Sequence, residues 1–128
     1  SFEEICRLAE GDDQYDRFLD RQQVELASAG GCVLGSRLAI WLLPSATLRV
    51  YLTASPEERA RRIAQREGGD PVRAREDVLA RDTRDRNRYL RLYGIDIDDY
   101  RLADLIVDTE AGGPPYVAQA ILAALLAG

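Results

Sequence analysis

The chain has 128 residues, of which 46% are hydrophobic, and this supplies enough apolar material for the core of one domain. Its net charge is −5 and it has no basic tail, so the composition argues against a nucleic-acid-binding protein. Histidine and lysine are absent, which excludes Ser-His-Asp and Cys-His nucleophile systems, Schiff-base lysines and a phosphate-binding lysine among these residues.

The first part of the chain predicts two helices and a short strand. Residues 2–9 have the apolar spacing of a short amphipathic helix. A second helix begins after Asp12-Asp13, whose carboxylates suit a helix N-terminus, and it ends at Gly30-Gly31. Residues 32–35 follow as a short β-like run.

The middle of the chain predicts one strand and then two helices. Ser55 and Pro56 suit the N-cap and the first position of the helix that follows the strand. Gly68-Gly69 breaks this helix, Asp70-Pro71 starts the next one, and Gly94 ends it. The junction between the two helices is either a lid hinge or an ordinary turn. These elements are a strand at 48–52, a helix at 57–66 and a helix from 71 to about 93.

The last part of the chain predicts a strand and a helix. Residues 103–107 are nearly continuously apolar, as a buried parallel strand should be, and Pro114-Pro115 opens a helix over 116–127. Because strands alternate with helices, the pattern indicates an α/β fold with a parallel sheet. No apolar run approaches the ~20 residues of a membrane span, so we expect a cytoplasmic protein without a membrane partner.

Cysteines and clustered acids give no sign of a metal site. Cys6 and Cys32 lack a CxxC spacing and a histidine partner, which argues against zinc and fits a reduced compartment. The acidic run at 96–99 lacks the spacing and the glycine of a calcium loop. We therefore expect no metal ligands among the candidate site residues.

The most informative stretch is RDTRDRNR, residues 81–88. On a helix, three arginines and one carboxylate of this stretch fall on one narrow face, namely Arg81, Arg84, Asp85 and Arg88. Guanidinium groups bind phosphate oxygens bidentately and a carboxylate can accept hydrogen bonds from sugar hydroxyls, so this face suits a phosphorylated ribose. The alternative interpretation is a solvated helix stabilised by surface ion pairs.

The distribution of charge favours the anion site. Residues 59–91 hold 11 arginines and 6 acidic residues, a balance of +5, whereas the rest of the chain has a balance of −10. A locally positive cleft in an acidic protein attracts small anions without binding nucleic acid.

Five stretches of the chain follow one another in a fixed order: DRFLDRQQVELA, VLGSRLAIWLL, VYLTASPEERARRIAQREGG, RDTRDRNRYLRLYGIDIDD and ADLIVDT. Together they resemble the cytidylate kinases of the short type found in archaea and some bacteria, which are P-loop nucleoside monophosphate kinases. The resemblance implies a parallel sheet flanked by helices. It also implies transfer of the γ-phosphoryl group from Mg-ATP to CMP or dCMP, with these nucleotides as the expected small-molecule partners and the oligomeric state left open.

The resemblance also assigns roles to residues of this chain. Arg37 matches an arginine that helps to hold CMP, although an ion pair at the end of a strand is the alternative. Arg81, Asp85 and Arg88 match the motif that binds the ribose and phosphate of the monophosphate. Arg81 and Arg88 would also neutralise charge on the phosphoryl group during transfer.

Further candidates are weaker. Asp20 and Arg21 match a helix near the monophosphate pocket, where they would orient the base or fix neighbouring elements. Arg62, Arg66 and Arg84 are candidates for contacting the phosphates of ATP, and surface ion pairing explains each of them almost as well.

One part of the family pattern is missing. The phosphate-binding loop, GxxGxGK followed by Ser or Thr, has no counterpart in this sequence. In this fold the strand before that loop lies in the middle of the sheet, between the neighbours that correspond to residues 32–35 and 48–52. Without it, backbone groups inside the core would lack partners. We therefore expect the chain to be the C-terminal portion of a longer polypeptide, inactive alone, with the main ligands of ATP and Mg²⁺ in the missing N-terminal segment.

This expectation divides a single incomplete domain into four parts. The parts are the monophosphate-binding helices (1–31), core strands and a helix (32–66), the lid hinge and arginine-rich helix (67–93), and a core strand with the C-terminal helix (94–128).

The alternative function is a non-catalytic nucleotide-binding or assembly module that has lost the phosphate loop. A purely helical interaction domain is disfavoured by the two β-like runs.

Overall fold

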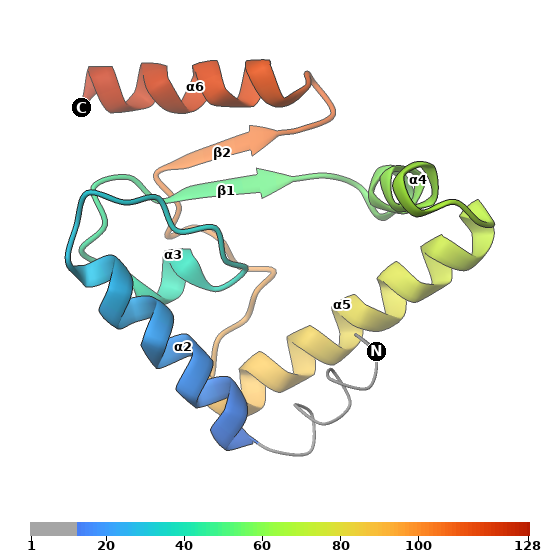
Figure 1. Ribbon diagram of the computed structural model, residues 1–128, viewed down its shortest axis with the longest axis horizontal. Helices are drawn as coiled ribbons and strands as arrows, with labels where there is room; N and C mark the ends of the chain where they lie inside the picture. The colour runs from blue at the N-terminus through green and yellow to red at the C-terminus, as the bar shows by residue number, and fades with distance from the viewer. Residues whose placement is uncertain (1–12) are drawn as a thin grey trace.

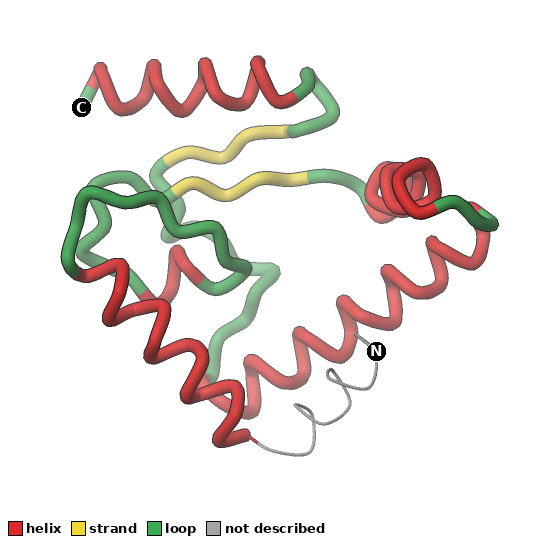
Figure 2. Tube along the Cα trace, in the orientation of Figure 1, coloured by secondary structure: helices red, strands yellow, loops and turns green. Residues whose placement is uncertain are grey.

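A small parallel sheet with helices around it forms the part of the chain that the computed structural model describes, residues 13–128 (Figure 1). The helix expected at 2–9 lies outside these residues. Figure 2 shows how helices and strands alternate along the chain. The elements are α2 (Asp13–Ser28), α3 (Ala39–Leu42), β1 (Val50–Thr53), α4 (Pro56–Glu67), α5 (Pro71–Tyr93), β2 (Leu105–Asp108) and α6 (Pro114–Ala127).

The helix boundaries agree with the capping residues read from the sequence. Ser55 caps α4 by accepting a hydrogen bond from the Glu58 backbone N–H at 3.2 Å. Asp70 caps α5 in the same way, and Gly94 ends this helix in the left-handed conformation, with φ of 65°. The predicted break between the two long helices is therefore confirmed.

Strands β1 and β2 pair in parallel, with Val50 opposite Leu105 and Thr53 opposite Asp108. Both begin about two residues later than the sequence pattern predicted. Helix α6 packs along β2, and α5 runs from α4 to the start of α2 (Figure 1). The α/β class with a parallel sheet is thus observed, and no helix between residues 13 and 128 is long and apolar enough to cross a bilayer.

The prediction of a strand at 32–35 is wrong for this structure. These residues form no ladder, and Val33 is 99% exposed. A strand needs a partner for its backbone N–H and C=O groups, and among residues 13–128 none runs beside this segment. The short helix α3, which the sequence did not suggest, follows it.

One edge of β1 also lacks a paired strand within the described residues. A cavity of about 400 Å³ is lined by five consecutive residues, 50–54, together with Ser36, Arg37 and Ile40. Because successive strand residues point to opposite faces, a cavity that touches all five runs along the edge of the strand and not against one face. The residues that directly follow the unpaired segment 32–35, Ser36 and Arg37, therefore line the same cavity as the open edge of β1.

The core of the described residues is small. Leu52 and Ile106 of the sheet remain 50% and 51% exposed, although parallel strands are usually covered on both faces. The buried apolar residues are Leu38, Ile40, Ala60, Val78, Leu92, Ile97 and Val107.

Candidate functional site

Asp85 lies at the centre of the candidate site and is only 7% exposed. It points inward because α5 places it seven residues from both Val78 and Leu92, which are the other buried residues of this helix. Its carboxylate accepts a hydrogen bond from Nη1 of Arg37 at 2.8 Å and from Nη2 of Arg88 at 3.1 Å. The structure thus brings together three of the predicted substrate-binding residues.

A second carboxylate, that of Asp82, extends this site. Arg59 of α4 donates to it in a bidentate manner, with Nη1···Oδ2 at 2.8 Å and Nη2···Oδ1 at 2.6 Å. Arg37 donates to the same Oδ1 from Nη2 at 3.2 Å. We call the resulting chain of five alternating charges the arginine–aspartate network; its members in order are Arg59, Asp82, Arg37, Asp85 and Arg88.

The arginines of the network favour the ionised form of the Asp82 carboxylate. Burial alone would raise the pKa of Asp82, but hydrogen bonds from Arg59 and Arg37 outweigh it and hold this pKa below its ordinary value. The hydrogen bond to Asp82 in turn raises the pKa of Arg59. Three guanidinium groups and two carboxylates leave the network with a formal charge of +1, in a place from which water is partly excluded.

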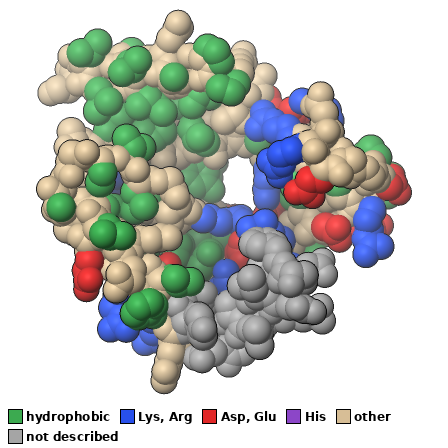
Figure 3. All heavy atoms as spheres, in the orientation of Figure 1, with side chains coloured by type: hydrophobic (Ala, Val, Ile, Leu, Met, Phe, Trp, Pro, Cys, Tyr) green, Lys and Arg blue, Asp and Glu red, His purple; other side chains and the backbone are tan. Residues whose placement is uncertain are grey.

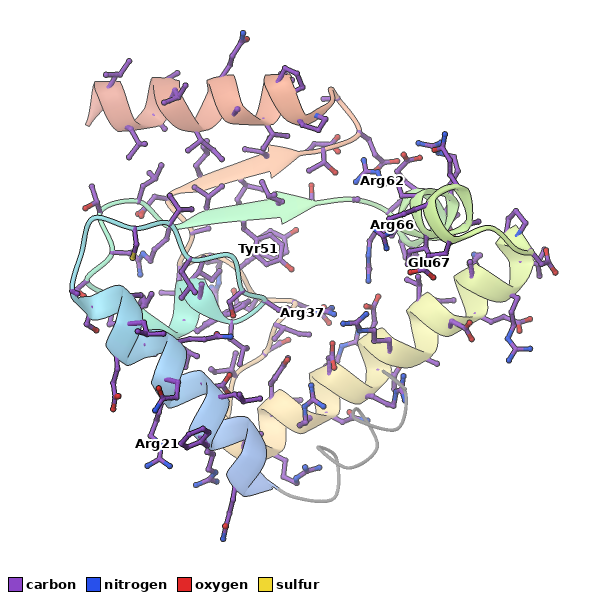
Figure 4. The ribbon with its side chains drawn as sticks, viewed as in Figure 1. Arg21, Arg37, Tyr51, Arg62, Arg66 and Glu67 are labelled. Atoms are coloured by element: carbon purple, nitrogen blue, oxygen red, sulfur yellow. The ribbon has the colours of Figure 1, made fainter. Side chains whose placement is uncertain are left out.

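This positive network opens onto the cavity beside β1. Arg37 and Arg59 both line the cavity, and so do two tyrosines, Tyr51 and Tyr100, whose rings are stacked with centroids 4.2 Å apart. Burial raises the pKa of Tyr51, so its phenol stays protonated at neutral pH. Arginine side chains gather around a hollow in the middle of the face drawn in Figure 3, and Arg37 and Tyr51 lie toward it in Figure 4.

The remaining arginines of α5 that the sequence singled out lie at the surface. Arg81 and Arg84 are exposed residues, whereas the side chain of Arg88 is only 14% exposed. The inward face of α5 is therefore centred on Asp82 and Asp85 and not on the arginines that flank them.

The predicted ATP-side arginines of α4 lie away from the network (Figure 4). Arg62 donates to Thr109 through Nη1···Oγ1 at 3.0 Å and through Nη2 to the backbone carbonyl at 3.1 Å, so it ties α4 to the end of β2. Arg66 is 70% exposed and pairs with Glu67 at 3.6 Å.

Asp20 and Arg21 are also separate from the network. They line a second cavity of about 670 Å³ between α2 and the end of α5. Asp20 accepts a hydrogen bond from the Tyr93 hydroxyl at 2.5 Å, which joins these two helices. Arg21 is exposed and points away from Arg37 (Figure 4).

Arg59 and Asp82 were missed as site residues by the sequence analysis. Asp82 falls three residues before Asp85 and four after Val78, so it shares the buried face of α5. That spacing was a usable signal. The pairing with Arg59 had no such signal, because it joins two helices.

The acidic and cysteine side chains of residues 13–128 form no cluster of metal-ligand type. No group of three or more of them could hold a metal ion, and the carboxylates of the network are already bound by arginines.

Comparison with a family model and comparison with individual proteins both match this chain to cytidylate kinases. The family described as "Cytidylate kinase-like family" matches residues 4–111. A cytidylate kinase of Pyrococcus horikoshii is 40% identical over 125 residues, covering 98% of this chain and 65% of that protein. A cytidylate kinase of Pyrococcus abyssi is 41% identical over 125 residues, covering 98% of this chain and 69% of that protein.

A bacterial relative gives the same match over a shorter stretch. Cytidylate kinase 2 of Borreliella afzelii is 48% identical over 99 residues, covering 76% of this chain and 56% of that protein. The chain spans about two thirds of the length of the two Pyrococcus relatives. No solved structure matches it.

Proposed function

The chain belongs to the cytidylate kinase-like family, and from this premise we propose that it supplies the acceptor-binding part of an enzyme that transfers a phosphoryl group from ATP to CMP or dCMP. The observation that carries the proposal is that Arg37, which lines the cavity of about 400 Å³, and Arg88 both donate hydrogen bonds to Asp85. Side chains of a merely solvated helix would extend into water instead.

The charges of the network suit a nucleoside monophosphate. A phosphate monoester carries a charge of about −1.5 to −2 at pH 7, which complements the +1 of the network. In the proposed complex Arg37, Arg81 and Arg88 bind the phosphate, and Arg81 and Arg88 neutralise the charge of the group in transit. Movement of the exposed Arg81 side chain into the cavity is part of this proposal.

Asp85 is proposed to recognise the ribose. A carboxylate has about four acceptor positions on its two oxygens. Arg37 and Arg88 use two of them, so acceptor capacity remains for a sugar hydroxyl.

The residues outside the network keep secondary roles in the proposal. Arg66 and Arg84 are exposed and would contact the phosphates of ATP. Arg62 could do so only by leaving Thr109, so its contacts favour a structural role. For Asp20 and Arg21, the bond from Tyr93 to Asp20 favours fixing neighbouring elements over orienting the base.

The proposal includes one further strand alongside β1, contributed by polypeptide outside these 128 residues and followed by the phosphate-binding loop. The open edge of β1 and the cavity along it support this part, as does the absence of lysine from the sequence. That segment would hold the phosphates of ATP together with Mg²⁺. The 128 residues alone should accordingly bind CMP but transfer no phosphoryl group.

Two measurements on the 128-residue chain test whether it binds CMP and whether it lacks phosphoryl transfer. Isothermal titration calorimetry with CMP, dCMP and UMP should give saturable binding, and an ADP-release assay with ATP and CMP should give no turnover. Turnover by the chain alone would contradict the missing-strand part of the proposal. Absence of any binding by a cooperatively folded chain would contradict the kinase assignment itself.

A second candidate is a non-catalytic module for nucleotide binding or assembly. The half-exposed Leu52 and Ile106 of the sheet favour it, because uncovered apolar side chains on a parallel sheet suit a protein partner. A folded chain that bound neither CMP nor ATP and self-associated in sedimentation experiments would support this candidate.

A further inference from the structure

Asp82 holds two arginines from different parts of the chain on one carboxylate. Nη2 of Arg59 lies 2.6 Å from Oδ1 of Asp82, and Nη2 of Arg37 lies 3.2 Å from the same oxygen. The two Nη2 atoms can therefore be no further apart than these two hydrogen bonds laid end to end. Two guanidinium groups at this spacing can contact one phosphate group together.

Both arginines face the cavity beside β1 and neither is fully buried. Their side chains are 37% exposed for Arg37 and 32% exposed for Arg59, whereas Asp82 is 15% exposed. The cavity also touches Thr53 and Ala54, at the carboxyl end of β1. In open α/β sheets, ligands bind outside the carboxyl ends of the strands.

Resting on the proposed function, we infer that Arg59 is a further phosphate-binding residue of this cavity and that Asp82 is the positioning residue that holds it beside Arg37. Without the carboxylate, the two guanidinium groups would repel each other across a partly buried space. With it, both are held in place before the phosphate arrives, so less side-chain entropy is lost on binding.

A purely structural reading of the pair also has to be tested. Arg59 and Asp82 join α4 to α5, and these helices could need the link for packing alone. The chain offers a matched control, because Arg75 and Glu57 join the same two helices with Nη2···Oε1 at 3.0 Å. Their side chains are 50% and 61% exposed, and they do not line the cavity beside β1.

The experiment compares Arg59→Ala, Asp82→Asn and Arg75→Ala in the 128-residue chain by calorimetric titration with CMP and with cytidine. Arg59→Ala and Asp82→Asn should each weaken CMP binding by about tenfold or more, equal to about 1.4 kcal/mol, while cytidine binding stays unchanged. Arg75→Ala should leave the affinity for both ligands unchanged. The difference between CMP and cytidine isolates the phosphate from the fold.

Two further variants guard against loss of structure. Arg59→Lys keeps the charge but not the two-pronged geometry, and Asp82→Glu keeps the carboxylate, so both should show smaller losses of CMP affinity than the first two variants. Circular dichroism verifies that each variant is folded before titration.

The outcomes separate this inference from the proposed function. If the unmodified chain binds CMP and Arg59→Ala binds it equally well, or if Arg75→Ala loses as much affinity as Arg59→Ala, the inference is wrong and the proposed function stands. If the unmodified folded chain binds no CMP, both are wrong.

Discussion

Replacing Asp85 with asparagine removes the negative charge between Arg37 and Arg88 with almost no change of shape. Breaking a fully buried charge pair costs about 3–5 kcal/mol. Here the Arg37 side chain is 37% exposed and water can solvate it, whereas Arg88 is 14% exposed, so most of the loss arises at Arg88. We expect the free energy of unfolding to fall by about 2 kcal/mol, measured by urea denaturation followed by circular dichroism.

The same helix supplies the control. Arg73 and Asp77 of α5 also form an ion pair, with Nε···Oδ1 at 3.4 Å, but their side chains are 75% and 62% exposed. Asp77→Asn should therefore change the free energy of unfolding by less than about 0.5 kcal/mol. Equal losses for Asp85→Asn and Asp77→Asn would mean that the network is as solvated as a surface pair, and the reasoning would be refuted.

Three other predictions concern stability. Arg62→Ala should lower the free energy of unfolding by about 1 kcal/mol, seen in thermal melts, because its hydrogen bonds to Thr109 and Glu58 are lost; an unchanged melt would show that these bonds contribute nothing. Since folding lowers the pKa of Asp82 below its usual 3.8, its contribution is present above that pH and is lost as the pH falls through the lower folded value. The urea midpoint should thus drop more steeply below about pH 4 for the unmodified chain than for Asp82→Asn, and parallel curves would contradict this. Gly94→Ala should cost about 1 kcal/mol because this residue has a φ of 65°, whereas Gly35→Ala, without a positive φ, should cost less in the same denaturation assay.

The elements that could be predicted from the sequence are those with local causes. Ser55 and Asp70 cap their helices through backbone groups two or three residues away, and Gly94 ends α5 through its own conformation. These interactions depend only on neighbouring residues, so residue type and spacing identify them. The strands β1 and β2 were found because their apolar runs are nearly continuous, each interrupted by a single charged residue.

The strand expected at 32–35 shows where such reasoning ends. Its apolar residues satisfy the local pattern, but a strand exists only if another chain segment pairs with it, and the pattern contains no information on that partner. The same limit applies to Arg59 and Asp82, which lie 23 residues apart and meet only because α4 packs on α5. By contrast, the roles of Arg37 and Asp85 at one substrate site were anticipated through resemblance to a family, and their direct ion pair was not anticipated at all.

The central claim is that the arginine–aspartate network binds the phosphate of a nucleotide. The side-chain Nε–Hε signals of the arginines in ¹H–¹⁵N NMR spectra test this claim most directly. Titration with CMP should shift the signals of Arg37 and Arg88 in a saturable manner, while the signal of the exposed Arg73 stays in place and cytidine alone produces much smaller shifts. If CMP left the signals of Arg37 and Arg88 unmoved, or shifted Arg73 equally, the network would be a structural ion-pair cluster and not a nucleotide site.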